Sequence, residues 1–261
     1  MDHAAIKRAY LQVDSALATA LKAAVKTLVA QLVPADVQAH PKAIRELTVP
    51  AAWRARVQAE ARRSLVVTYQ AGAASARAEL AKGSRKFDLA PQDLPEWIDT
   101  LAYNLSQSLG EDVVKALRAI WANALAQDWS VGKLQEVLAG ALAGYQDASG
   151  GDITPARIAT IVRTTNTNAF NQARMDVFSD PSLDGFVEAL EYSAILDDRT
   201  TPLCEYLDGR TYALDDEFWT DYMPPNHFNC RSLAIPVVQG DDWEQSDPPK
   251  AGMEPADGFS V

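Results

Sequence analysis

The only two cysteines of this chain are Cys204 and Cys230, and one of its three histidines, His227, stands three residues before the second cysteine. Thiolates and an imidazole are ligands that zinc takes in tetrahedral sites. His-x-x-Cys places two of these groups on one short loop, so the sequence predicts a zinc site formed by Cys204, His227 and Cys230. Asp208 is the expected fourth ligand, with Asp198 or a water as alternatives.

Other interpretations of these residues are open. The same segment could be a packed turn without metal, or Cys204 and Cys230 could form a disulfide. A thiol beside a histidine could also serve a cysteine hydrolase, and zinc with an open position could activate water in a hydrolase or nuclease. If His227 is a ligand, however, the remaining histidines, His3 and His40, lie in the distant N-terminal half. We therefore expect no enzymatic activity and assign no catalytic residue.

The residues around the cysteines suit tight turns. Asp198 can accept a hydrogen bond from the backbone two residues on, which starts a turn. Pro202 suits the first turn of a short helix, and Gly209 can adopt the positive φ that ends it. Arg231 is expected to form a bidentate ion pair with Asp198 or Asp208, tying the two parts of the segment together.

The two parts also resemble a known family pattern. That pattern is Asp-x-Arg-Thr, then a Cys or His three residues before Leu-Asp-Gly, then Pro-Pro-x-His-x-x-Cys-Arg. It belongs to the phage Mu F-like minor head proteins, also called the phage head morphogenesis domain. The residues that match as structural positions are Asp198, Arg199, Thr200, Gly209, Pro224, Pro225 and Arg231, of which we expect the proline pair to be stiff and extended.

The resemblance covers roughly residues 154–237. Upstream of the motif, Arg163-Thr164-Thr165-Asn166 with Asn171-Gln172-Ala173-Arg174 looks like a diverged form of the family's Arg-Thr-Glu-Thr-like helix. The resemblance implies a minor head protein of a tailed phage or prophage, associated with the portal vertex and acting in capsid assembly and in DNA packaging or ejection. Such a protein would be made in the host cytoplasm and reside in the virion, with the portal and other head proteins as partners.

Charge is divided unevenly along the 261 residues, whose net charge is −11. Residues 1–150 hold 17 lysines and arginines against 15 acidic residues, whereas residues 151–261 hold 7 against 20. The change coincides with a flexible stretch at 149–152, so we predict a helical domain at 1–150 for partner or portal attachment, the family domain at 151–239, and an acidic proline-containing tail. The tail, 240–261, is too polar to fold alone, so we expect a partner chain to hold it if it is ordered.

Apolar residues at three- and four-residue intervals predict long amphipathic helices, and alternation predicts strands. The expected helices lie at 3–33, 50–83, within 95–144 and at 154–178, and the expected paired strands at 186–196 and 233–238. The polar face of the last helix could be solvated, bind a partner, or form hydrogen bonds in the core. The predicted class is α+β and mainly α: a long-helix N-terminal bundle followed by a small α+β domain with a short β-sheet.

The helix around residues 54–86 is basic, with eight lysines and arginines against two glutamates. This face is either solvated or a contact for an acidic partner or packaged DNA, and DNA contact would make the chain a DNA-binding adaptor. The apolar stripe along 1–83 is long for a small domain, so we expect it to pack on the portal or on a second copy of the chain. No apolar run approaches the ~18 residues that a membrane span needs, and we expect no membrane contact.

Overall fold

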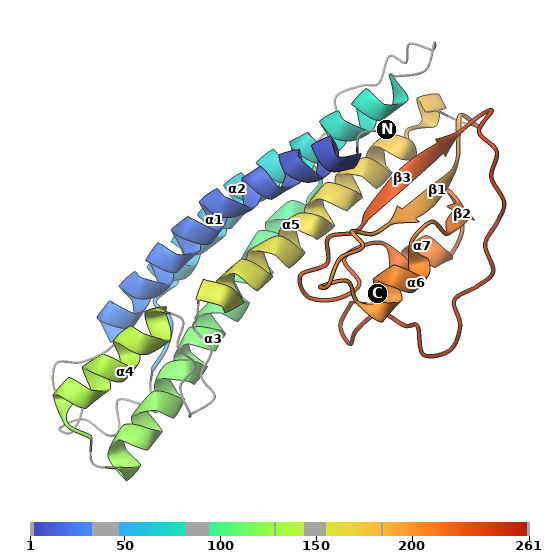
Figure 1. Ribbon diagram of the computed structural model, residues 1–261. Coiled ribbons are helices and arrows are strands. Elements are labelled where there is room, and N and C mark those ends of the chain that lie inside the picture. The colour runs from blue at the N-terminus through green and yellow to red at the C-terminus, as the bar shows by residue number, and fades with distance from the viewer. Residues whose placement is uncertain are drawn as a thin grey trace. The chain divides into compact units, whose positions relative to one another are not determined.

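The computed structural model describes residues 3–32, 47–81, 94–127, 129–143, 155–183 and 185–259. The elements, in order, are α1 (His3–Leu32), α2 (Ala51–Leu80), α3 (Trp97–Ala126), α4 (Val131–Ala143), α5 (Pro155–Phe178), a 3-10 turn (Pro181–Leu183), β1 (Val187–Ser193), α6 (Pro202–Leu207), β2 (Thr211–Ala213), α7 (Phe218–Tyr222) and β3 (Leu233–Val238) (Figure 1). The predicted class, mainly α with a small sheet, is confirmed.

The chain divides into two compact units. The helical unit comprises residues 12–65 and 96–162, and the sheet unit comprises residues 1–11, 66–95 and 163–261. Helices α1, α2 and α5 contribute residues to both units, so neither unit is one continuous segment. The expected boundary at 149–152 lies outside the described residues, and the division at residues 150 and 239 stays a prediction.

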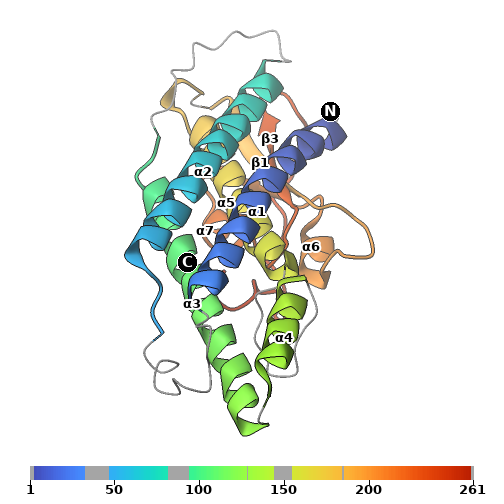
Figure 2. The ribbon, with the colours of Figure 1, turned by 90° about the vertical axis from the view of Figure 1, so that its left-hand side faces the viewer.

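The helical unit has its own apolar core, in which parts of α1 and α2 lie side by side (Figure 2). The indole Nε1 of Trp53 donates a hydrogen bond of 2.8 Å to the carbonyl oxygen of Ala24. A Cβ atom at Gly110 would lie 3.0 Å from the Val49 side chain. The glycine therefore lets α3 pack closely against Val49. Ser130 caps α4, since its hydroxyl accepts from the Lys133 backbone amide at 3.2 Å.

The apolar stripe expected to need another chain is covered within this one over its described residues. Buried members include Leu17, Leu21, Val25 and Leu28 of α1, and Trp53, Val57, Leu65, Tyr69, Ala76 and Leu80 of α2. Over these residues the stripe is buried within the chain, and the expected contact of part of residues 1–83 with the portal or a second copy stays a prediction. Burial of this stripe thus gives no reason for an intermolecular contact.

The sheet unit is built on three antiparallel strands in the order β2-β1-β3. Tyr192 of β1 pairs with Ala234 of β3, which confirms the expected pairing of the two long strands. On this sheet packs a cluster that includes Phe170 of α5. The short elements β2 and α7 were not predicted, because three and five residues carry too little periodicity to detect.

The acidic tail lies along the outer side of β2 within the same chain. The Ser246 amide donates to the Thr211 carbonyl at 2.9 Å, and the Thr211 amide donates to the Ser246 hydroxyl at 3.0 Å. The Gln245 side chain accepts from the Ala213 amide at 3.0 Å. The tail needs no core of its own because hydrogen bonds to β2 hold it in place. These bonds also pair the backbone amides and carbonyls at the open edge of that strand. The expectation that a partner chain must hold an ordered tail is therefore wrong.

A buried ion pair joins α2, α5 and β3 inside the sheet unit. The guanidinium of Arg174 donates to both carboxylate oxygens of Glu79, at 2.7 and 2.8 Å. It also donates twice to the Ala234 carbonyl, at 3.1 and 2.9 Å, and once to the Ser75 hydroxyl at 3.1 Å. The two charged side chains are only 0% and 2% exposed. All five donors of the arginine are used, so the buried charge is fully compensated.

We predict that Glu79→Ala destabilises the protein strongly. It leaves the Arg174 charge buried without its counter-ion, which costs roughly 3–5 kcal/mol of unfolding free energy. Glu136→Ala is the matched control, because that glutamate pairs with Lys133 while its side chain is 71% exposed. Denaturant titration of both variants measures the difference. Equal small losses in the two variants would show that the buried pair does not stabilise the fold.

Candidate metal centre

The structure brings Cys204, His227 and Cys230 together, as the sequence predicts. Their ligand atoms all lie within 4.8 Å of one another, and among the described residues they are the one group of this kind. The Cys204 sulfur lies 3.1 Å from His227 Nε2 and 4.0 Å from the Cys230 sulfur. Both cysteines are buried and free, and a disulfide would need sulfurs about 2.05 Å apart.

A hydrogen bond fixes the orientation of the histidine. His227 Nδ1 lies 2.8 Å from the carbonyl oxygen of Phe228, which can only accept, so the proton is assigned to Nδ1. Nε2 then faces the Cys204 sulfur. Metal-binding histidines commonly have this arrangement, in which the second ring nitrogen donates to a carbonyl.

The cluster favours negative charge on one sulfur. A hydrogen bond from Cys230 is the largest cause that lowers the pKa of Cys204 far below its usual value, against the opposing effect of burial. The hydrogen bond to Cys204, together with burial, raises the pKa of Cys230. Burial opposes charge on His227, but its hydrogen bond to Cys204 and the charge of that sulfur outweigh this and raise the His227 pKa. The hydrogen bonds of the cluster thus favour negative charge on Cys204 over Cys230.

Two buried side chains of the sheet unit support the sulfur of Cys204. The Tyr192 hydroxyl lies 3.2 Å from this sulfur, and the Asn226 amide donates to that hydroxyl at 3.0 Å. Burial, followed by the charges of Cys230 and Cys204, raises the pKa of Tyr192 well above its usual value. Tyr192 is thus a neutral hydrogen-bonding partner. Sequence reasoning missed it because a tyrosine in a strand is read as core.

Helix α6 presents Cys204 from its first turn. Thr201 caps the helix through its hydroxyl, which accepts from the Cys204 backbone at 3.4 Å, and Pro202 starts it as predicted. Gly209 ends the segment with the expected positive φ of 75°. Asp208 stands at the C-cap, and its carboxylate accepts from the Ala194 amide at 2.7 Å. Asp208 thus lies outside the group of three ligand atoms and has a turn-closing bond of its own.

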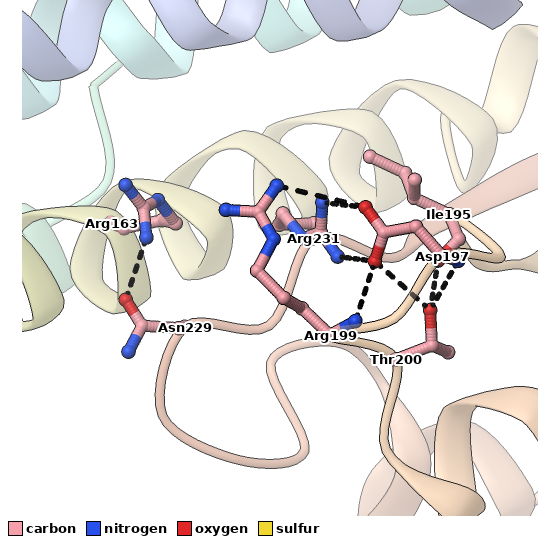
Figure 3. A network of polar contacts seen from close by, with 7 residues as sticks. All are labelled: Arg163, Ile195, Asp197, Arg199, Thr200, Asn229 and Arg231. Carbon is pink, nitrogen blue, oxygen red and sulfur yellow. Dashed lines mark hydrogen bonds and ion pairs between the residues drawn. The ribbon is translucent and has the colours of Figure 1, made fainter.

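The turn before α6 is organised by Asp197 (Figure 3). Its carboxylate accepts from the Arg199 amide at 3.0 Å and from both terminal nitrogens of Arg231, at 2.8 and 2.5 Å. Thr200 closes the turn, donating to the Ile195 carbonyl and accepting from the Asp197 amide at 2.9 Å. The predicted bidentate contact of Arg231 is present.

Its partner, however, is neither Asp198 nor Asp208, and the predicted turn at Asp198 is shifted by one residue. Two adjacent aspartates cannot be told apart by turn preference alone. The pattern Asp-x-Arg-Thr was the available signal, because it places its aspartate at position 197. Pro224 and Pro225 are joined by a cis peptide bond, where the sequence predicted an extended pair.

We predict that Asp197→Asn lowers the melting temperature at neutral pH, whereas Asp198→Asn changes it little. The hydrogen bond from Arg231 is the largest cause that lowers the pKa of Asp197. A lowered folded-state pKa stabilises the fold above the unfolded value of about 3.9, and this contribution is lost as the pH falls through the folded value. The gap between wild type and Asp197→Asn should therefore narrow below about pH 4. Equal decreases in melting temperature in the two variants would contradict the assignment of Asp197 as the partner of Arg231.

One face of α5 holds the segment that carries Cys230. Asn229 accepts from Arg163 at 2.8 Å through its side chain, and its amide donates to the Thr164 hydroxyl at 3.0 Å. The Thr167 hydroxyl donates to the Cys230 carbonyl at 2.8 Å. The polar face of this helix therefore forms hydrogen bonds inside the fold, which decides between the alternatives left open by the sequence.

The contact continues along the next turns of α5. Asn171 donates to the Ser232 carbonyl at 3.1 Å and accepts from the Ala234 amide at 3.1 Å. Arg174 then donates to the Ala234 carbonyl. We call this set, Arg163, Thr164, Thr167, Asn171 and Arg174, the polar ladder of α5. It pairs with the chain from Asn229 to Ala234, so the positions of Cys230 and Arg231 follow from the helix.

We predict that Asn171→Ala destabilises the protein by about 1–3 kcal/mol, because it leaves the buried Ser232 carbonyl and Ala234 amide without partners. Asn168→Ala is the matched control, since Asn168 lies on the same helix and is exposed. Denaturant titration compares the two. A control that loses as much stability as Asn171→Ala would show that general helix propensity, and not the ladder, is responsible.

Comparison with known proteins places this site in a family. Residues 112–235 match the family model described as "Phage Mu protein F like protein", a range that contains the polar ladder and all three candidate ligands. This match confirms the resemblance seen in the motifs of the chain. None of the described helices is long and apolar enough to cross a membrane.

Two curated proteins are similar over parts of the chain. The "Mu-like prophage FluMu F protein" of Haemophilus influenzae is 27% identical over 158 residues, which are 57% of this chain and 34% of that protein. The "Putative capsid assembly protein F" of Escherichia phage Mu is 31% identical over 78 residues, which are 30% of this chain and 17% of that protein. The chain thus spans about a third or less of the length of these relatives. No solved structure matches it.

Proposed function

We propose that this protein is a minor head protein of a tailed phage or prophage, which acts in capsid assembly at the portal vertex and in DNA packaging or ejection. The match of residues 112–235 to the Phage Mu protein F like family carries this proposal. One similar protein is named a putative capsid assembly protein of phage Mu. The protein would reside in the virion, and its partners would be the portal protein and other head proteins.

The chemistry of the cluster supports an architectural role over a catalytic one. Cys204 and Cys230 are 2% and 0% exposed, so neither sulfur can reach a substrate as a nucleophile. His227 Nε2 points to a sulfur and its Nδ1 donates to a carbonyl, which leaves neither nitrogen for proton transfer. The alternative, a metal-dependent hydrolase or nuclease, requires turnover that disappears in His227→Ala.

The basic helix is partly neutralised by the protein itself. Arg62 of α2 forms an ion pair with Asp99, and Arg63 pairs with Glu60 at 2.6 Å. These contacts reduce the positive potential available for DNA. Contact with packaged DNA through this face therefore ranks second to attachment to head proteins. Salt-dependent binding of DNA by the full chain, lost in Arg56→Glu, would reverse that order.

An acidic depression of about 700 Å³ in the sheet unit suits attachment to a basic segment of another head protein. Its walls include Phe178, Trp243 and three carboxylates, from Asp180, Glu188 and Asp215. Carboxylates beside aromatic rings can hold the charged head and the apolar stem of a lysine or arginine. The charge of this surface complements a cationic partner.

The location of the protein tests the proposed function directly. We expect an epitope-tagged copy to purify with phage heads and, by electron microscopy of labelled particles, to mark one vertex of each head. A tag that remains in the soluble fraction after particle assembly, or that covers all vertices, would contradict the proposal.

We predict that Asp215→Lys reduces incorporation into heads several-fold while the protein stays folded, because Asp215 is exposed and lines the acidic depression. Asp257→Lys is the matched control, an exposed acidic residue outside that depression. Quantitative immunoblots of purified particles give the ratio. Equal incorporation of both variants would exclude the depression as an attachment surface.

A further inference from the structure

We propose that Cys204, His227 and Cys230 bind one zinc ion that clamps the two parts of the motif together, with a water as the fourth ligand. This inference goes beyond the role in head assembly and does not depend on it. The ion would join α6 to the segment held by the polar ladder.

The distances fit tetrahedral zinc. With Zn–S about 2.3 Å and Zn–N about 2.0–2.1 Å, the edges of a tetrahedral site are ~3.8 Å between sulfurs and ~3.5 Å between sulfur and nitrogen. The structure has 4.0 Å between the two sulfurs and 3.1 Å from the Cys204 sulfur to His227 Nε2. Small side-chain movements are enough to place an ion between these atoms.

The three donors are prepared for a cation. His227 turns Nε2 toward the Cys204 sulfur, at 3.1 Å, because Nδ1 donates to the Phe228 carbonyl. Protons held by the two thiols or by Nε2 would leave for solvent when the ion binds, so that two thiolates and a neutral imidazole balance the charge of Zn²⁺. The softness of the sulfurs favours zinc over calcium or magnesium.

The ligands lie on backbone that the fold holds on both sides. Cys204 is fixed by the cap from Thr201, and Cys230 by the bond from Thr167 to its carbonyl. Because hydrogen bonds fix the backbone of both cysteines, little conformational entropy is lost on binding an ion.

A buried oxygen near the cluster lacks a donor. Asn226 is 0% exposed, and its Nδ2 donates to Tyr192 and Tyr222, whereas Oδ1 has no hydrogen-bond partner among the residues that the structure describes. Tyr192 in turn contacts the Cys204 sulfur. A buried acceptor without a donor is unusual and commonly marks an unseen water or ion. A zinc-bound water in this region would supply such a donor.

The test is metal analysis of the full-length protein, purified without chelator and refolded with zinc. We expect about one equivalent of zinc per chain in wild type, and less than about a tenth in Cys230→Ser and His227→Ala. Asp208→Asn, the matched control, should keep its zinc, because Asp208 caps α6 and stands outside the cluster. Loss of zinc in this control would overturn the assignment of a water as the fourth ligand.

A second measurement covers the case in which the ligand variants fail to fold. Wild type loaded with Co²⁺ should show the thiolate-to-cobalt charge-transfer absorption and the intense visible bands of a tetrahedral site. Removal of the ion by a chelator should also lower the melting temperature, since an ion bound only by the folded state stabilises it. Background zinc in wild type, or a cobalt spectrum without thiolate bands, would overturn the proposal.

Discussion

The fold of the sheet unit depends on the hydrogen bonds that one face of α5 makes to the backbone of residues 229–234. Without these bonds, buried amides and carbonyls of this segment would lack partners. The free energy lost by leaving such groups unpaired exceeds the free energy gained by pairing them. The polar ladder supplies these backbone partners at helical spacing, from Thr164 at one end to Arg174 at the other. An extended chain and a helix are thus held in one register.

The rest of the unit follows from this register. Arg174 is the last residue of the ladder, and its guanidinium forms an ion pair with Glu79. This buried guanidinium therefore links α2 to α5 and β3. Cys230 and Arg231 lie within the paired segment. One meets Cys204, and the other meets Asp197 in the turn before α6. The acidic tail forms hydrogen bonds with the outer edge of β2. The polar helix within the segment that matches the Phage Mu protein F like model therefore has an architectural reason.

Much of this was accessible from sequence, and the failures have physical causes. Long helices and the two longer strands were predicted because periodicity accumulates over many residues, whereas β2 and α7 were too short. The cluster of Cys204, His227 and Cys230 was found because these residue types are rare here. The partner of Arg231 was misplaced by one residue, since adjacent aspartates have equal propensity. The tail was misjudged because composition does not show an open strand edge that can hold a polar segment.

Hydrogen exchange of individual backbone amides tests the central claim most directly. The amides of Asn229 and Ala234 donate to side chains of α5, not to another backbone carbonyl. If the polar ladder holds this segment, both amides exchange as slowly as those that pair β1 with β3, and Asn171→Ala accelerates Ala234 selectively. Exchange of Asn229 and Ala234 at the rate of exposed loop amides in the wild-type protein would contradict the account.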